Sequence, residues 1–570
     1  MALSPENLHK LELPEQISNL VFSDDHHLCE LQDAQRAMVL AKLKDYEEAA
    51  LQKSISPIAN IASPLNFNNP EAVIQAQIYI CRGLLSPIRR IPLEILMVIF
   101  ECHVGPQSSL KIDAVRKQTP FDLCLVCRAW RHIAINHPPL WSAPIFEMQQ
   151  GEPFLQVTET HAAAIGAWLS HIGTFPWSAR IKVSTWTEAA RRHKEIRYKC
   201  PPHPNGDPLH HFVSPSALQG LRRLHIHLPN SPTLTTRLGT MAFPNVDSLV
   251  VEMHLSVQDS YWAGRTPPAA ELPICPSLKK AVLSDVRMYR IPEHFPWGQL
   301  THLHLAKQLP FERIVRVLRH CSSLCHGSFD HSGQQGTLST EGSAPQGRIV
   351  LKHLTTLTFS GNLSFPYPFT GLSWPNLSHL SLKDTYEDPL QWDTYNLEFM
   401  GTLTCLQYAD SGRGILPRGF VQLIKSCPLL TRLSLNAAPY DEVVSHLIFD
   451  NAQPSLPLLE ELTIHLEYVS RIGENTVDCL AEMVSSRTRP FCNGCVNLKT
   501  FAICIGRLGY SEVDWRARIS SALLRFNSRL NVRVVGGGCS EYLWMGPKIP
   551  ALVHWDDGLF ESLGMFSKFL

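Results

Sequence analysis

The sequence predicts an α/β protein in which a small helical unit precedes a long stack of strand-and-turn repeats. Two observations carry this prediction. Between residues 84 and 146, two apolar stretches have the three- and four-residue spacing of helices. From Leu221 onward, a Leu-x-x-Leu-x-Leu-like unit returns at intervals of roughly 20 to 50 residues, which is typical of repeat architectures.

The bulk composition excludes several classes of protein. The chain has 570 residues, 44% of them apolar, which is enough for several domains or one long repeat array. Lys+Arg and Asp+Glu are both 51, so the basic excess of nucleic-acid-binding proteins is missing and no nucleic acid partner is expected. No run of about 18 apolar residues predicts a membrane span.

The N-terminus and the cysteines bear on the compartment. The stretch MALSPENLHKLELPEQ lacks the basic start and apolar core of a secretory signal. The 16 cysteines are scattered and are expected to be reduced thiols. The expected location is therefore cytoplasmic, nuclear or both.

Residues 1–83 are expected to form an N-terminal arm and linker. Residues 28–53 predict a helix whose apolar positions are Leu31, Met38, Val39, Leu43 and Tyr46. It is too short for a firm coiled coil, so packing on the following helical unit and self-association both stay open, and packing is favoured. Residues 54–75 are rich in Pro, Asn and Ser and predict a linker.

The first helix of the small unit lies in LLSPIRRIPLEILMVIF, residues 84–100. Pro92 suits a first helical turn, where its missing N–H costs nothing. One face carries Ile91, Ile95, Val98, Ile99 and Cys102, and other apolar side chains fill much of the remainder. A helix that is apolar nearly all round must be buried on two sides. The protein's own core can cover one side, and the other needs a second cover.

The second helix comes after a polar loop, residues 105–120, and lies in FDLCLVCRAWRHIAINHPPLWSAPIF, residues 121–146. Its apolar stripe is Leu123, Val126, Cys127, Trp130 and Ile133, with Asp122 as the expected N-cap. His137-Pro138-Pro139 should stop the helix, and Leu140-Trp141 should act as apolar anchors after it. Residues 84–146 thus carry more apolar surface than about sixty residues can hide.

These two stretches in this order resemble an F-box, in the form common in mushroom-type fungal proteins. The family pattern is a Leu-Pro-x-Glu-Ile/Leu-Leu helix, a Val-Cys-x-x-Trp helix and then Leu-Trp. Ile91-Pro92 stands where Leu-Pro is commoner, and the loop between the helices is long, as is frequent in the fungal form. The segment AAAIGAWLSHIGTFPWSARIKVS, residues 162–184, also resembles the family's entry into its recognition region.

The resemblance implies that a Skp-type adaptor covers the second apolar side and links the chain to a cullin in an SCF-type ubiquitin ligase. By motif position, the resemblance also implies which residues lie at or behind the adaptor interface. They are Pro92, Leu93, Ile95, Leu96, Ile99, Phe100, Val126, Cys127, Trp130 and Trp141. The alternative is an ordinary helical hairpin with a self-contained core.

The repeats extend through most of the remaining chain. Copies begin at Leu221, Val246, Leu278, Leu300, Leu354, Leu377, Leu403, Leu430, Leu459 and Leu498, with a damaged copy at 321–329. In LTHLHL, alternation puts Leu303 and Leu305 on one side of a strand and two histidines on the other. Since no unit can bury its leucines alone, neighbours are expected to stack. PFERIVRVLRHC and PRGFVQLIKSC predict returning helices.

This pattern resembles an irregular leucine-rich-repeat solenoid over residues 147–545, with a tail at 546–570. Asn362 alone falls at the repeat's usual Asn position, and a conventional α/β domain is the alternative. The solenoid interpretation implies an exposed, His-rich concave face that binds a protein substrate, formed by Arg223, His225, His302, His304, Thr356, His379, Arg432 and Glu461. The plainer alternative is that these are solvated strand positions.

The sequence offers little catalytic chemistry. Cys124-x-x-Cys127 falls inside the predicted apolar helix and is interpreted as packing, and Cys492-x-x-Cys495 lacks the second pair of a zinc site. HExxH, P-loop and GxSxG patterns are missing, so no cofactor, metal or catalytic residue is predicted. The expectation is a non-catalytic adaptor subunit of a ubiquitin ligase. The alternatives are a non-degradative interaction scaffold without a cullin and an enzyme hidden in the repeats.

Overall fold

The computed structural model describes much of the chain, in segments. They are residues 13–22, 31–52, 69–104, 108–111, 120–150, 159–185, 218–229, 238–254, 271–284, 292–309, 311–331, 348–361, 372–384, 398–410, 419–436, 440–450, 455–466, 475–488, 497–505, 512–526 and 530–536, with Leu11, Thr236 and Val286. The fold is mixed α/β with a large parallel sheet. It divides into two compact units, Met1–Leu221 and Arg222–Leu570, so the predicted boundary at residue 146 falls inside the first unit.

The first unit begins with three helices: α2 (Glu15–Phe22), α3 (Asp33–Gln52) and α4 (Pro70–Leu85). Their shared core consists of Ile17, Leu20, Val39, Cys81 and Leu84. The predicted helix at 28–53 is thus confirmed as α3, and it packs on α2 and α4. Helix α4 corrects the predicted linker 54–75, because it begins at Pro70 after Asn69, whose Oδ1 accepts the Glu71 N–H at 2.9 Å.

The small helical unit comes directly after α4. It contains η2 (Pro87–Arg90), α5 (Leu93–Val104), α6 (Pro120–Cys124), α7 (Arg128–Ile135) and η3 (Pro138–Trp141). The prediction of one continuous second helix is wrong. Cys127 has extended backbone, and its Sγ accepts the Trp130 N–H at 3.4 Å, so it caps a new helix. The Arg131 Nε donates to the Cys124 carbonyl at 2.9 Å and satisfies the end of α6.

Three parallel strands complete the first unit, with α8 (Glu159–Ile172) between the second and the third. They are β1 (Ser108–Lys111), β2 (Pro144–Gln150) and β3 (Trp177–Thr185). The predicted anchors hold: Leu140 and Trp141 are buried, and the Trp141 indole donates to the Ala134 carbonyl at 2.7 Å. Trp168 packs edge-on against Trp141 and donates to its carbonyl at 2.9 Å, which ties α8 to η3.

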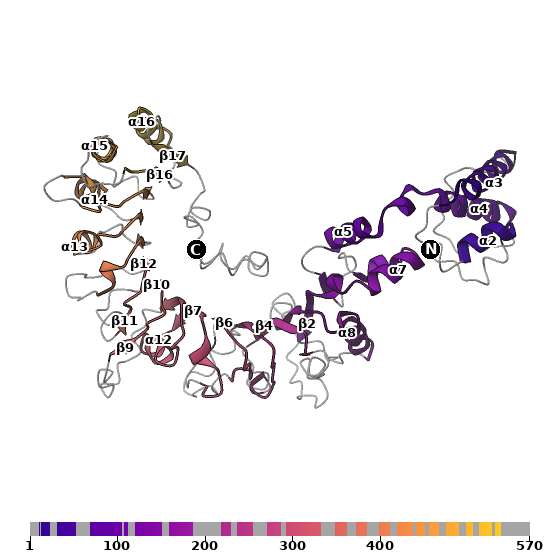
Figure 1. Ribbon diagram of the computed structural model, residues 1–570, viewed down its shortest axis with the longest axis horizontal. Coiled ribbons are helices and arrows are strands. Elements are labelled where there is room, and N and C mark those ends of the chain that lie inside the picture. The colour runs from indigo at the N-terminus through magenta and orange to yellow at the C-terminus, as the bar shows by residue number, and fades with distance from the viewer. Residues whose placement is uncertain are drawn as a thin grey trace, which may run out of the picture. The chain divides into compact units, whose positions relative to one another are not determined.

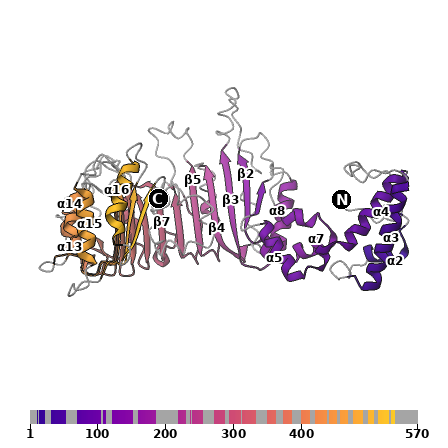
Figure 2. The same cartoon turned by 90° about the horizontal axis from the view of Figure 1, so that it is seen from above.

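The second unit is built on a parallel sheet whose strands follow chain order (Figures 1 and 2). The strands are β4 (Leu221–Pro229), β5 (Ser248–His254), β6 (Lys280–Ser284), β7 (His302–Leu309), β8 (His326–His331), β10 (Thr356–Gly361), β12 (His379–Asp384), β13 (Cys405–Asp410), β14 (Arg432–Asn436), β15 (Glu461–Leu466), β16 (Thr500–Ile505) and β17 (Asn531–Gly536). Every predicted copy forms one of these strands, the damaged copy included, as β8. The last strand, β17, was not predicted as a repeat.

Five α-helices of the second unit are described in the connections between the strands of this sheet. They are α12 (Phe311–Leu318), α13 (Phe420–Lys425), α14 (Tyr440–Leu447), α15 (Thr476–Arg487) and α16 (Glu512–Leu524), and α13 to α16 lie on a single side (Figure 1). Parallel strands need crossover connections, and these are right-handed. When each crossover moves one strand along in the same direction, all of them pass over the same face.

The leucines of the repeats form the core on the crossover side. Leu224, Leu303, Leu380, Leu406 and Leu433 are at most 2% exposed. The predicted alternation is therefore confirmed, and so is the apolar face of α12, where Ile314, Val317 and Leu318 are buried. In the damaged copy, Gly327 takes the leucine position because the Phe329 ring fills the space: a Cβ on Gly327 would lie 2.7 Å from it.

A ladder of hydroxyl groups runs along the strand starts, and the sequence reasoning missed it. In repeats such as LTHLHL and LSHLSL, the second residue donates its hydroxyl to a carbonyl of the preceding repeat. The donors are Thr301, Thr355, Ser378, Thr404 and Thr431, at 3.0 to 3.2 Å. Each hydroxyl thus joins one turn to its neighbour.

We expect Thr404→Val to lower the free energy of unfolding by about 1 kcal/mol, since it removes one such bond and keeps the side-chain shape. Urea unfolding followed by far-UV circular dichroism measures the change. Thr463→Val, at another half-buried position on β15, is the matched control. An equal loss in both variants would show that the ladder bond contributes nothing of its own.

No helix in the described residues is long and apolar enough to cross a membrane.

Candidate functional site

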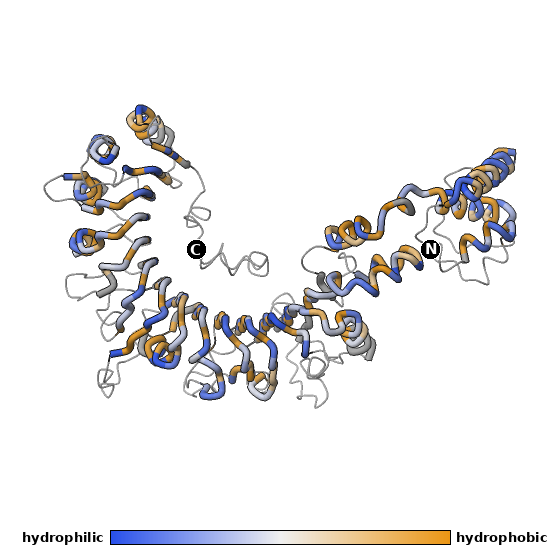
Figure 3. The backbone as a smooth tube through the Cα atoms, viewed as in Figure 1, coloured by the Kyte–Doolittle hydropathy of each residue, from blue (hydrophilic) through white to orange (hydrophobic). Residues whose placement is uncertain are grey.

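The outer face of α5 is a row of exposed aliphatic side chains. Ile95, Val98 and Ile99 are 52%, 54% and 41% exposed, and their three- and four-residue spacing puts them on one face. Figure 3 shows hydrophobic residues along this helix. Single exposed apolar residues are ordinary on a protein surface, but several on one helix face mark an interaction site.

The opposite face of α5 is buried in the protein's own core. Leu96, Phe100 and Val104 are 2%, 0% and 6% exposed and succeed one another at four-residue steps. The Phe100 ring packs on Trp130 of α7, with the ring centroids 4.8 Å apart. The structure thus shows one side of this helix buried in the protein's own core and the other side exposed, and the cover of the exposed side stays a prediction.

A second exposed apolar stretch lies at the break between α6 and α7. Leu125 and Val126 are 67% and 53% exposed, and Cys127 is exposed as well. Backbone bonds from Leu125 and Val126 to the carbonyls of Asp122 and Leu123, at 3.1 and 3.3 Å, hold this turn. The break turns Val126 and Cys127 out of the stripe in which the sequence placed them.

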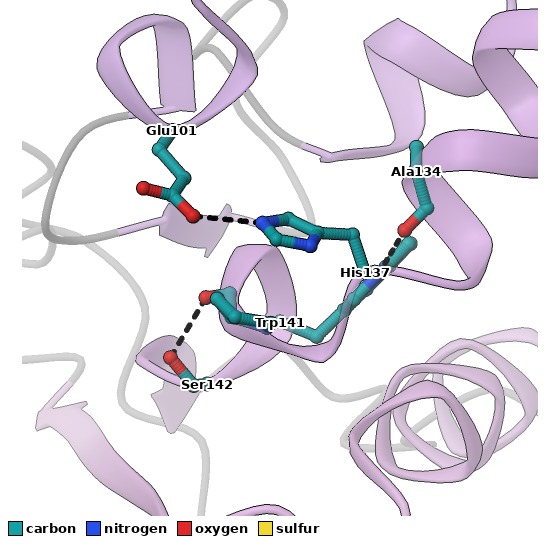
Figure 4. A network of polar contacts seen from close by, with 6 residues as sticks. Glu101, Ala134, His137, Trp141 and Ser142 are labelled. Atoms are coloured by element: carbon teal, nitrogen blue, oxygen red, sulfur yellow. Dashed lines mark hydrogen bonds and ion pairs between the residues drawn. The ribbon is translucent and has the colours of Figure 1, made fainter. Parts of the chain in front are cut away.

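An ion pair fixes the outer end of α5 to the segment after α7. The His137 Nε2 lies 2.7 Å from the Glu101 Oε1, and the imidazole points from the start of η3 toward α5 (Figure 4). His137 is mostly buried, with 17% of its side chain exposed. This contact joins α5 to the segment between α7 and η3.

The predicted adaptor residues divide into three groups. Those exposed at the surface are Pro92, Leu93, Ile95, Ile99, Val126 and Cys127; Trp130 is half-buried; Leu96, Phe100 and Trp141 are buried. The buried three can support an interface but cannot line it. Val98 and Leu125 are exposed and belong with the first group, although the prediction did not include them.

In the second unit, the face of the sheet opposite the leucines carries a row of mostly polar residues. The strand register gives the first row, one residue per strand: Arg223, Ser248, Lys280, His302, His326, Thr356, His379, Cys405, Arg432 and Glu461. It contains six of the eight predicted substrate residues. His225 and His304 lie in the next row, two residues along each strand.

The sequence predicted more residues of this face to be exposed than the structure shows. His225 is 0% and Thr356 is 6% exposed, so both predictions of surface exposure are wrong. Exposure does not follow the position along the strand, because Thr358 in the middle of β10 is half-buried whereas Thr356 at its start is buried. Lys280 and His326 share the row and were missed, because LKKAVL and the damaged copy match the repeat pattern poorly.

A buried ionic cluster lies at the start of the sheet. The Glu252 Oε2 is 2.8 Å from the His227 Nδ1 and 3.4 Å from the His225 Nε2. Burial opposes ionisation of Glu252, but the hydrogen bonds and charges of His225 and His227 outweigh it and lower the pKa of the carboxyl. The cluster stabilises the β4–β5 pair.

Two further histidines are held neutral by burial. Burial lowers the pKa of His304 and of His465 to about 4, against an unfolded value of about 6.5. The unfolded chain therefore binds more protons between these values, and stability is full above about pH 6.5 and falls as the pH falls toward about 4. The lowered pKa of Glu252 acts in the same direction.

We therefore expect acidification from about pH 7 to about pH 4.5 to lower the free energy of unfolding by roughly 1–3 kcal/mol per buried histidine. Urea unfolding across this range measures the slope. His304→Gln should flatten it, whereas His320→Gln, at an exposed position, should leave it unchanged. An unchanged slope in His304→Gln would contradict the assignment.

The cysteines support the packing interpretation in part. Cys124 is buried, and burial raises the pKa of its thiol, whereas Cys127 is exposed at the helix break. In the described residues no group of three or more His, Cys, Asp or Glu side chains could hold a metal ion. Cys492, Cys495, Asn362 and the tail at 546–570 lie outside the described residues.

Comparison with known proteins gave no relative: no family model matches this chain, and neither does any curated protein.

Proposed function

We propose that this chain is the substrate-recruiting subunit of an SCF-type ubiquitin ligase. In this proposal the helical unit at 84–146 is an F-box, and the second unit is an irregular leucine-rich-repeat solenoid. One observation carries the proposal: α5 buries Leu96 and Phe100 in its own core while Ile95, Val98 and Ile99 stay exposed on the other side. The order of the sequence motifs supports a Skp-type adaptor as the cover.

The receptor half of the proposal rests on the sheet of the second unit. The leucines are buried on one face of this sheet, and the opposite face carries a row of mostly polar residues at the strand starts. A surface built from one residue of each strand is broad and shallow, which suits a protein segment better than a small molecule. The parallel strands, which follow one another in chain order, are the feature that favours the solenoid.

In this proposal the chain acts by holding the target close to the ubiquitin-loaded enzyme. The apolar face of α5 binds the adaptor, the adaptor links to a cullin, and the polar face of the second unit holds the target. Tethering raises the effective concentration of target lysines beside the ubiquitin-loaded enzyme. This chain's own residues bind and orient, and the covalent steps belong to the other subunits.

The test is co-expression of the full chain with a Skp-type adaptor and a cullin, with affinity capture and then size-exclusion chromatography. The expected result is a stoichiometric complex of all three. Failure to capture the adaptor would overturn the proposal. Capture of the adaptor without the cullin would overturn the ligase role and indicate a non-degradative scaffold instead.

A further inference from the structure

Helix α3 has apolar side chains on a second face, outside the core that it shares with α2 and α4. Val39 lies in that core and is 0% exposed, whereas Leu40 and Leu51 are 49% and 78% exposed. We call Leu40, Lys44, Glu47 and Leu51 the α3 stripe. They follow one another at steps of four, three and four residues, which puts them on one face of the helix.

Helix α4 adds an aromatic ring beside the α3 stripe. The two helices lie side by side (Figures 1 and 2). The Arg82 Nη2 lies 2.8 Å from the Glu47 Oε1, so the side of α4 that carries Arg82 neighbours the stripe. Tyr79 precedes Arg82 by three residues, lies on the same side of α4 and is 61% exposed. Three large side chains with exposed apolar surface thus gather on neighbouring faces, which marks an interaction surface.

The order of residues in the α3 stripe is self-complementary. Leu40 and Leu51 lie equally far along the helix from the point between positions 45 and 46, and so do Lys44 and Glu47. In a symmetric dimer, residue i contacts residue j and residue j contacts residue i. When two α3 helices pack antiparallel about this point, Leu40 of each copy faces Leu51 of the other. Lys44 of each copy then faces Glu47 of the other.

The charges distinguish between the two orientations of such a helix pair. In a parallel pair each residue would face its own counterpart, so lysine would meet lysine and glutamate would meet glutamate. Like charges placed directly opposite each other disfavour that arrangement. In the antiparallel pair both contacts join opposite charges. The side chains of Lys44 and Glu47 are 79% and 41% exposed, so both reach the surface at which a second copy would pack.

The contacts that these two groups make within the chain are compatible with a second copy. The Lys44 Nζ lies 3.8 Å from the Glu48 Oε1, a long contact between two exposed side chains, so little free energy holds the ammonium there. Glu47 accepts from Arg82, and a carboxylate has lone pairs for further donors. In the dimer, Glu47 would thus lie between Arg82 of its own chain and Lys44 of the second copy.

We propose that the α3 stripe is a self-association surface, through which two copies of this chain form an antiparallel dimer. A partner of different sequence would not require the leucines and the charges to share one midpoint, so the pattern favours a second copy. Charged groups in the middle of an apolar contact fix its register and lower its affinity. The dimer is therefore expected to dissociate on dilution. This inference needs neither the adaptor nor the target, so it stands apart from the proposed ligase role.

The test is sedimentation velocity of the full chain over a series of concentrations, without adaptor. We expect a monomer–dimer equilibrium. Leu40→Asp with Leu51→Asp should raise the dissociation constant by about 100-fold or more, because the dimer would bury the new carboxylates against apolar surface. The matched control is Leu429→Asp with Leu524→Asp, at leucines that are 43% and 61% exposed outside α3. It should change the dissociation constant by less than about twofold.

A wild-type chain that stays monomeric at every concentration would overturn the proposal. So would equal losses in the α3 variant and its control, since they would place the contact elsewhere. Far-UV circular dichroism of each variant shows whether it has folded.

A charge exchange tests the antiparallel register itself. Lys44→Glu alone and Glu47→Lys alone each set like charges opposite each other at both contacts, so each should weaken its own dimer by about tenfold or more. When the two variants are mixed, opposite charges face each other again at both contacts. We expect a mixed dimer at least about tenfold tighter than either variant's own dimer, detected by sedimentation with a fluorescent label on one variant. A mixed dimer no tighter than these would overturn the antiparallel register.

Discussion

The double substitution Ile95→Asp and Val98→Asp is expected to abolish capture of a Skp-type adaptor while the chain stays folded. Both side chains are more than half exposed, so aspartate costs the free chain little. In a complex, both carboxylates would be buried against an apolar partner without a counter-charge. Central interface residues are worth about 2–4 kcal/mol each, so the affinity should fall by a factor of about 100 or more.

The measurement is affinity capture of the adaptor, with a thermal unfolding curve for each variant. Leu429→Asp with Leu524→Asp is the matched control, because these leucines are exposed before β14 and on α16, away from the proposed face. Wild-type capture by the double variant on α5 would show that the adaptor binds elsewhere or not at all.

Leu96 would be a poor choice for this test, although the F-box motif includes it. Its side chain is 2% exposed beneath α5, so Leu96→Asp buries a charge in the core of the helical unit. We expect that variant to unfold the unit, and its loss of binding would say nothing about the interface. A substitution on the exposed side of α5 tests binding, whereas a substitution on the buried side tests folding.

Replacing Arg487 by methionine is expected to cost the second unit about 3 kcal/mol or more of unfolding free energy, because three buried carbonyls each lose a donor. This arginine is 1% exposed at the end of α15. Its Nε donates to the Leu447 carbonyl at 2.8 Å, and its Nη2 and Nη1 donate to the carbonyls of Ser455 and Leu456 at 2.8 and 3.1 Å. The guanidinium thereby joins the C-terminus of α14 to the turn before β15.

Methionine keeps the volume and removes all three donors, so buried carbonyls lose their partners. Urea unfolding measures the loss. Arg316→Met, exposed on α12, is the control and should change stability by less than about 0.5 kcal/mol. Arg487→Lys should recover only part of the loss, because an ammonium cannot reach three carbonyls in the geometry of a planar fork. A stability change as small as the control's would contradict this role.

The elements that the sequence predicted well are those with a periodic apolar signal. Alternation in LTHLHL was enough to place Leu303 in the core and His302 on the other face, since a strand has only two sides. The missed elements depend on single capping groups. Cys127 starts α7 with a thiol where an oxygen is usual, and the Asn69-Pro70 start of α4 was hidden in a stretch of turn-forming composition.

The sequence predicted an apolar surface on the first helix and a polar row on the sheet, and the structure changed which residues belong to each. The apolar excess of residues 92–102 was visible, but periodicity cannot tell which apolar face the core takes, so buried Leu96 and exposed Ile95 looked equivalent. The polar row needed the register between strands. Only that register shows that Lys280 and His326 lie beside His302, since no local sequence signal joins residues so far apart along the chain.

The strict agreement between strand order and chain order has a consequence for how the protein is made. In the large sheet, each strand from β5 onward pairs with the strand of that sheet that precedes it in the chain, and each hydroxyl of the ladder reaches back to the preceding repeat. The strand with which each new repeat pairs has therefore already been synthesised when that repeat leaves the ribosome. The unit can therefore fold from its N-terminal side while the rest of it is still being synthesised. A chain that is released early would end in an unpaired edge strand of an already folded sheet.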